Sequence, residues 1–213
     1  MNFLAHACLA GSSDDAIVGS LMGDFVKGPL TDAHGGEITR ALALHRRIDT
    51  YTDAHEVVRE SRRRVSAPHR RFAGILIDMF YDHFLARRWD EYYETPLERF
   101  TARVYSALRE RHAVLPEPLR VIAPRMAAAD WLGSYRHVEA VGLALDRIGR
   151  RLKRGNALLH SSRELLAHYD AFDADFRAFF PDVTRFARAH DGVQQKTGEA
   201  LIPTLLHVPL TAP

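Results

Sequence analysis

The chain has 213 residues, of which 46% are hydrophobic and 26% charged, and its formal net charge is +2 at pH 7. This length fits one domain with a substantial core better than two domains. The small net charge argues against a protein that coats nucleic acid, and no run approaches the roughly 20 apolar residues of a membrane helix. The composition therefore predicts a soluble globular protein with neither a nucleic-acid nor a membrane partner.

The N-terminal segment, residues 1–8, is apolar but has no basic leader, so we expect the first helix of the fold there rather than a signal peptide. Cys8 is the only cysteine. An intramolecular disulfide is therefore impossible, which agrees with a reducing compartment, and we expect a cytoplasmic protein.

Helical periodicity dominates the rest of the chain. Ser12 to Asp15 resembles a helix N-cap, and Gly28-Pro29 is a stop signal for a helix that is expected to run through Asp24. A loop is expected over 30–36, and further helices over 37–52, 68–89, from 95–96 onward, 119–135, 138–153 and 161–180, the last ending at Pro181. These elements predict an all-α, single-domain compact helical bundle over residues 1–190. Residues 191–213 are expected to form a loosely attached tail.

Three helices are predicted to carry ionisable side chains inward. In the helix over 37–52, His45 and Asp49 share one stripe with apolar residues, since positions three, four and seven apart lie on one face. Asp78 and Asp82 lie in a nearly all-apolar helix, where an ionised carboxylate is costly unless a cation or several donors meet it. Asp24 likewise shares a stripe with apolar residues. Three helices thus direct carboxylates inward.

Two further histidines are less clearly placed. His83 points about 100° away from Asp82 at 3.6 residues per turn, and His6 shares a face with Asn2. Each candidate taken alone has a common structural explanation, namely a buried ion pair or a hydrogen-bonded core histidine. Together they predict a metal site built from imidazoles and carboxylates: His6, Asp24, His45, Asp49, Asp78, Asp82 and His83. Such a ligand set without thiolates suits Mn²⁺, Fe²⁺, Mg²⁺ or Zn²⁺.

Basic residues near these positions extend the hypothesis. A bound metal ion can supply hydroxide near neutral pH, and Lys27, Arg46 and Arg47 are candidates for neutralising charge on a phosphate. Two further basic groups, Arg59 to Arg71 and Arg147 to Arg154, are either solvated helix faces or docking patches for an acidic partner or a phosphate. The residues alone therefore favour phosphoryl hydrolysis.

Four sequence blocks resemble the acyl carrier protein phosphodiesterase family. They are Met1-Asn2-Phe3-Leu4-Ala5-His6, Gly23-Asp24-Phe25-Val26-Lys27-Gly28, His45-Arg46-Arg47-Ile48-Asp49 with Thr52-Asp53, and Asp78-Met79-Phe80-Tyr81-Asp82-His83-Phe84-Leu85-Ala86 with Trp89. A weaker likeness continues through Leu165-Leu166, Tyr169 and Phe179-Phe180-Pro181, so that the resemblance covers about residues 1–187.

This resemblance implies an enzyme that removes 4'-phosphopantetheine from holo acyl carrier protein, giving the apo form. It also implies a divergent branch of the helical HD-type metal phosphohydrolases, with Mn²⁺ the favoured ion and Mg²⁺ or Fe²⁺ as alternatives. The HD signature is a His followed by an Asp, whereas Asp82-His83 has the reverse order, so the HD ligand assignment does not transfer directly to this sequence. The expected catalytic residues are Asp24, His45, Arg46, Asp49 and Asp82.

Acyl carrier proteins are acidic, and the resemblance therefore gives the basic groups a docking role, with Lys27, Arg47, Arg59, Arg62 and Arg63 as the expected contacts. Two other hypotheses stay open at this point. One is an HD-type hydrolase of a nucleotide or another small phosphoester. The other is a non-catalytic helical protein that binds an acidic partner.

Overall fold

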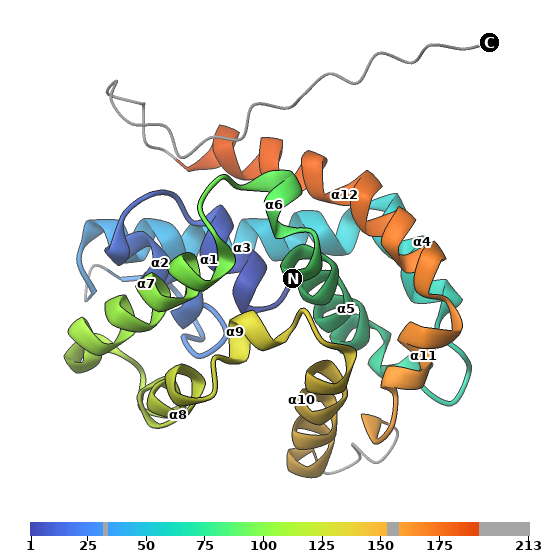
Figure 1. The fold of residues 1–213 in the computed structure, drawn as a ribbon. Helices are drawn as coiled ribbons and strands as arrows, with labels where there is room; N and C mark the ends of the chain where they lie inside the picture. The colour runs from blue at the N-terminus through green and yellow to red at the C-terminus, as the bar shows by residue number, and fades with distance from the viewer. Residues whose placement is uncertain (32–33, 153–157, 192–213) are drawn as a thin grey trace.

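The computed structural model describes residues 1–31, 34–152 and 158–191, and within these ranges the chain is all-α, with no strand (Figure 1). The predicted fold class is thus confirmed. The helices are α1 (Phe3–Leu9), α2 (Asp14–Met22), α3 (Gly36–Ala54), α4 (Glu56–Arg64), α5 (Ala73–Arg87), α6 (Trp89–Tyr92), α7 (Leu97–Glu110), α8 (Glu117–Ala128), α9 (Trp131–Ser134), α10 (Val138–Arg151), α11 (Ser162–Ala167) and α12 (Tyr169–His190), with 3₁₀ turns at Arg70–Phe72 and His112–Val114.

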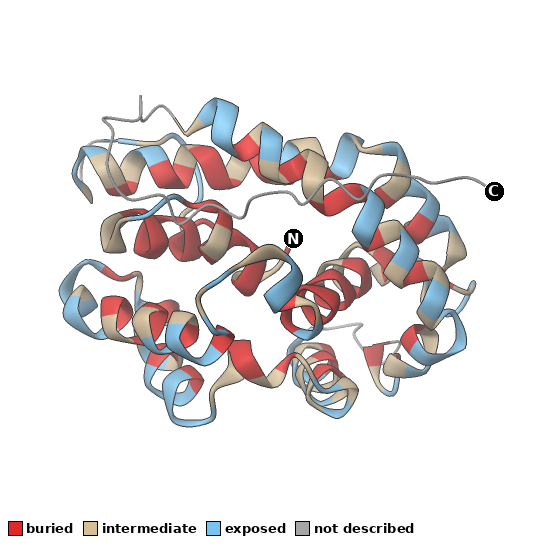
Figure 2. Ribbon diagram, turned by 45° about the horizontal axis from the view of Figure 1, so that its top comes forward, coloured by how far each residue is buried: buried red, intermediate tan, exposed pale blue. Residues whose placement is uncertain are grey.

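Helix α5 lies at the centre of the fold, because its sequence is apolar on almost every side. It packs against α1, α4, α10 and α12, and its residues are buried around nearly the whole helix (Figure 2). The seam between α5 and α12 is aromatic, with Phe80 against Phe172 and Tyr81 against Phe176 and Phe179. One continuous cluster of buried apolar residues joins these helices to α1 and α2, as expected of a single-domain bundle.

Helices α2 and α3 lie unusually close together. A Cβ atom on Gly19 would lie 2.6 Å from the carbonyl oxygen of Ile38 and 2.8 Å from the Cβ of Ala41, so only a glycine fits at this contact without a shift. This close packing brings the C-terminal end of α2 beside the middle of α3. The segment that follows α2 therefore lies next to the inward face of α3.

Several predicted boundaries were wrong. The helix expected to run through Asp24 ends at Met22, and Asp24 lies in the turn beyond it. The helix predicted to end at Pro181 continues to His190. A proline within a helix removes a backbone hydrogen bond, but Phe179, Phe180 and Val183 on either side are buried, and this packing holds the helix together.

Other differences concern the number of helices. The helix predicted over 119–135 is divided into α8 and α9 at Asp130, whose backbone is left-handed with φ of 36°. Residues 56–64 form α4, which was not predicted. The predicted tail begins at Asp191, but residues 192–213 lie outside the described part of the chain, as do Lys153 and Arg154. None of the described helices is both long enough and apolar enough to cross a bilayer.

Candidate metal centre

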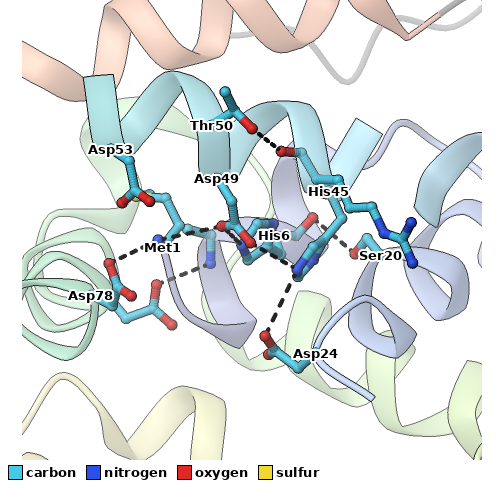
Figure 3. A network of polar contacts seen from close by, with 12 residues as sticks. Met1, His6, Ser20, Asp24, His45, Asp49, Thr50, Asp53 and Asp78 are labelled. Carbon is cyan, nitrogen blue, oxygen red and sulfur yellow. Dashed lines mark hydrogen bonds and ion pairs between the residues drawn. The ribbon is translucent and has the colours of Figure 1, made fainter. Parts of the chain in front are cut away.

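Two histidines and an aspartate meet where α1 contacts α3 (Figure 3). His6 comes from α1, and His45 and Asp49 are one turn apart on α3. The Nε2 atoms of His6 and His45 lie 3.0 Å and 3.2 Å from the two carboxylate oxygens of Asp49. The two imidazole rings stack with their centroids 3.7 Å apart. Each of the three side chains can offer one ligand atom, and these atoms lie within 4.8 Å of one another.

Burial and hydrogen bonding together shift the pKa values of the ionisable groups in this cluster. His6 and His45 are only 1% and 2% exposed. Burial lowers the pKa of His6 to about 4, against the opposing effect of the hydrogen bond to Asp49. Burial raises the pKa of Asp49, but hydrogen bonds from His45 and His6 outweigh it and hold that pKa well below its usual range. At neutral pH the cluster therefore contains a neutral His6 and an ionised Asp49, the forms that bind a cation.

The Nδ1 atoms of both histidines are buried, and neither has a hydrogen-bond partner within the described ranges. Because Asp49 can only accept, the Nε2 atoms carry the hydrogens in this arrangement and Nδ1 is left with a bare lone pair. Binding a cation at Nε2 would move that hydrogen to Nδ1. The donor set, two imidazoles and a carboxylate without a thiolate, fits a divalent ion such as Mn²⁺ or Fe²⁺.

Asp24 lies at the edge of this cluster. Its Oδ1 atom is 3.8 Å from Nε2 of His45, and its side chain is 46% exposed. The turn that carries it is held by Arg46, whose guanidinium donates hydrogen bonds to the carbonyl oxygens of Val26 at 3.0 Å and Gly28 at 2.7 Å. Arg46, expected from the sequence to be catalytic, thus holds the backbone that follows Asp24.

Asp78 flanks the cluster on the side of α5 (Figure 3). Its carboxylate forms a 2.9 Å ion pair with the α-amino group of Met1, which lies 3.9 Å from Oδ1 of Asp49. Burial lowers the pKa of this amino group, but Asp78 and Asp49 outweigh that effect and raise it above its ordinary value. The amino group was not predicted as a neighbour of the two carboxylates, because side-chain periodicity contains no information about a main-chain charge.

Asp82 and His83, both predicted as possible ligands, have other partners in the core. The oxygens of Asp82 accept hydrogen bonds from the backbone N–H groups of Leu4 at 2.8 Å and Ala5 at 3.2 Å, in the first turn of α1. The ring of His83 lies 2.8 Å from the carbonyl of Tyr135 and 2.8 Å from the hydroxyl of Tyr169. Asp82 therefore supports the helix that carries His6, and His83 joins α5 to two other segments.

The predicted docking residues differ in what they contact. Lys27, in the segment after α2, and Arg47, on α3, are exposed. Arg59 and Arg63 pair with acidic residues of their own helix, α4. Arg62 instead reaches α3, where it forms a 2.5 Å contact with Asp53, one turn beyond Asp49. Among the α4 arginines predicted to dock a partner, Arg62 is thus the one that contacts the helix of the cluster.

Comparison with known proteins places the chain in a family. The model of the family described as acyl carrier protein phosphodiesterase matches residues 1–183, which include every helix that contributes to the cluster. The chain belongs to the acyl carrier protein phosphodiesterase family. Relatives with that name include one from Photorhabdus laumondii, 33% identical over 90% of this chain and 97% of its own length. Another, from Enterobacter sp., is 35% identical over 85% of this chain and 94% of its own.

No solved structure matches this chain. The first three blocks that resemble the acyl carrier protein phosphodiesterase family contribute His6, Asp24, and His45 with Asp49 to the site. The fourth block contributes Asp78 at its edge and Asp82 beneath α1. The HD-type relationship stays a prediction.

Proposed function

We propose that this protein hydrolyses the phosphodiester that joins 4'-phosphopantetheine to holo acyl carrier protein, releasing the arm and giving the apo form. Two findings support the proposal. Relatives that share a third of the sequence carry the name acyl carrier protein phosphodiesterase. The observation that carries the chemistry is the cluster of His6, His45 and Asp49, with an exposed carboxylate at its edge. A cytoplasmic location, where the only cysteine stays reduced, agrees with this substrate.

In this proposal, His6, His45 and Asp49 would hold one divalent ion, and Asp24 lies beside it as a further carboxylate. Mn²⁺ is the favoured ion, and Mg²⁺ and Fe²⁺ are the alternatives. When bound, such an ion acidifies water and polarises a phosphoryl oxygen. The buried imidazoles support this assignment, because an ion would use the nitrogens that now face Asp49, and each Nδ1 is free to carry the displaced hydrogen.

The chain's own groups would complete the reaction. Asp24 is exposed and ionisable beside the cluster, and we assign it the role of accepting a proton from the attacking water. Lys27 and Arg47 are exposed cations on the segments that carry Asp24 and His45, and we assign them the negative charge of the phosphate. Arg46 fixes the turn that presents Asp24. No role in proton transfer is assigned to Asp82, since its oxygens meet the backbone of α1.

The direct test is an incubation of the purified protein with holo acyl carrier protein and Mn²⁺, followed by mass spectrometry. We expect the carrier to lose the mass of the prosthetic arm, and a chelator to reduce the rate by at least about 100-fold, because the ion supplies both water activation and charge stabilisation. Absence of this loss with Mn²⁺, Mg²⁺ and Fe²⁺ would rule out the proposed activity. Hydrolysis of small phosphodiesters without activity on the carrier would favour the small-phosphoester hypothesis.

The docking role of α4 makes a separate prediction. Arg62→Gln removes the cation that contacts Asp53 and leaves an unpaired negative charge near the cluster, so we expect the KM for the acidic carrier to rise by roughly 3- to 10-fold. Turnover of a small diester should change by less than about 2-fold. The matched control is Arg63→Gln on the same helix, because Arg63 pairs with Glu56 and Glu60 of α4 itself. Equal effects of Arg62→Gln on both substrates would contradict a docking role.

A further inference from the structure

The imidazole of His45 lies against the main chain of Gly23. A Cβ atom placed on Gly23 would lie 2.3 Å from both Cγ and Cδ2 of His45 and 2.5 Å from its Nδ1. Such similar distances to three adjacent ring atoms put the glycine over the face of the ring. His6 stacks on a face of the same ring at a centroid distance of 3.7 Å. If Gly23 and His6 lay on the same face of this ring, atoms of His6 would be among the nearest to the Cβ position. The three nearest atoms all belong to His45, so Gly23 and His6 lie on opposite faces.

The packing of Gly23 and His6 against the two faces of the His45 ring matters because the usual means of orienting a ligand histidine is missing. A metal-binding imidazole ordinarily donates its second N–H to a carboxylate or a carbonyl, which fixes the ring. The Nδ1 atom of His45 is buried without a hydrogen-bond partner among the described residues. Apart from the contact of Nε2 with Asp49, the orientation of this ring therefore depends on what packs against its two faces.

Backbone conformation does not explain a glycine at position 23. Its φ and ψ angles are −55° and −36°, in the right-handed helical region, which alanine adopts more favourably than glycine by up to about 1 kcal/mol. The unusual property of this position is space. A side chain of any size there would occupy the volume of the His45 ring.

We propose that Gly23 is a positioning residue of the metal centre: its lack of a side chain admits the His45 ring and, with His6, clamps that ring so that Nε2 faces the ligand carboxylates. The inference rests on the proposed function for its metal and adds how the ligand is oriented. It acts through His45 and not through contact with substrate. Close packing against Gly23 thus orients the His45 ring, as a hydrogen bond to the second ring nitrogen does for other metal-binding histidines.

The test compares Gly23→Ala with Gly19→Ala. Both glycines lie on the face of α2 that meets α3, and a Cβ on Gly19 meets Ile38 and Ala41 instead of a ligand. Mn²⁺ affinity is measured by titration calorimetry, and the His45 imidazole signals are followed by NMR in the metal-free protein. For Gly23→Ala we expect a loss of affinity of at least about 10-fold and shifted His45 signals. For Gly19→Ala we expect a lowered melting temperature, affinity within about 2-fold of wild type, and unshifted signals.

A double variant covers the case in which Gly23→Ala does not fold. His45→Ala removes the ring that the new methyl group would strike, so adding Gly23→Ala in that background should leave the melting temperature unchanged or raised. Adding Gly19→Ala there should still lower it. The inference is overturned if Gly23→Ala keeps wild-type affinity and unshifted His45 signals. It is also overturned if Gly23→Ala lowers the melting temperature as much in the His45→Ala background as in wild type. Because the NMR and stability measurements need no metal, they decide the role of Gly23 even if the wild-type protein binds none of Mn²⁺, Mg²⁺ and Fe²⁺, a result that would contradict the proposed metal centre.

Discussion

Replacing Asp49 with alanine is expected to abolish turnover and to weaken Mn²⁺ binding by at least about 100-fold, since loss of a group that only supports a ligand histidine already costs 10- to 100-fold. Asp49 is the residue on which the cluster converges, because its two oxygens contact the Nε2 atoms of His6 and His45. Its removal also leaves those two buried imidazoles without their carboxylate. Mn²⁺ titration calorimetry and the carrier mass assay measure the two effects.

The matched control is Asp53→Ala, one turn further along α3. The side chain of Asp53 is 65% exposed and pairs with Arg62, and no contact joins it to either histidine. Removing it should change Mn²⁺ affinity by less than about 2-fold, since a surface ion pair contributes little. Similar losses for both variants would mean that general negative charge attracts the ion, and the assignment of Asp49 as a ligand would fail.

The part of the site that periodicity could predict is the part confined to one helix. His45 and Asp49 are four residues apart, and this spacing places both on one face of α3 whatever the rest of the fold does. The burial of Asp82 and His83 also follows from the apolar sequence around them. Local pattern therefore identified His45, Asp82 and His83 as buried, but it failed for Asp24, which lies beyond the end of α2 and is 46% exposed.

The spacing of residues along a helix does not show which group each inward side chain contacts. Asp82 was expected to meet a cation, because a buried carboxylate needs compensation. Its compensation comes from backbone N–H groups of α1, a segment more than 70 residues away, and such donors have no side-chain signature. The position of His6 over His45 likewise depends on how α1 packs across α3. Pro181 shows the same limit, since tertiary packing around it outweighs the local preference that predicted a helix end.

The role now assigned to Asp82 predicts a stability effect where the sequence analysis expected a catalytic one. Asp82→Ala leaves the N–H groups of Leu4 and Ala5 without their acceptor in a fully buried position. Each unsatisfied donor costs about 1–3 kcal/mol. We therefore expect the free energy of unfolding, measured in urea at pH 6, to be about 3–5 kcal/mol lower for Asp82→Ala than for wild type. If the variant instead keeps wild-type stability and loses Mn²⁺ binding, Asp82 is a ligand and the structural role is refuted.

The pH dependence of stability offers a second measure of the same residue. Burial raises the pKa of Asp82 to about 7, against the lowering effects of the Leu4 and Ala5 N–H groups and the Met1 amino group, while Asp78 adds to the rise. In the unfolded chain this carboxyl ionises near pH 4, so between about pH 4 and pH 7 the folded state holds the extra proton. The contribution of Asp82 to the free energy of unfolding is therefore largest below pH 4 and falls as the pH rises to about 7.

Asp82→Asn cannot ionise and should lack this decline. The stability difference between wild type and Asp82→Asn should consequently shift by a few kcal/mol in favour of the variant between pH 5 and pH 8, as measured by urea unfolding at both values. A difference that stays constant would mean that Asp82 is ionised throughout, stabilised by the α1 backbone and the Met1 amino group. A shift in favour of Asp82→Asn would therefore mean that burial dominates the charge state of Asp82, and a constant difference would mean that the α1 donors dominate it.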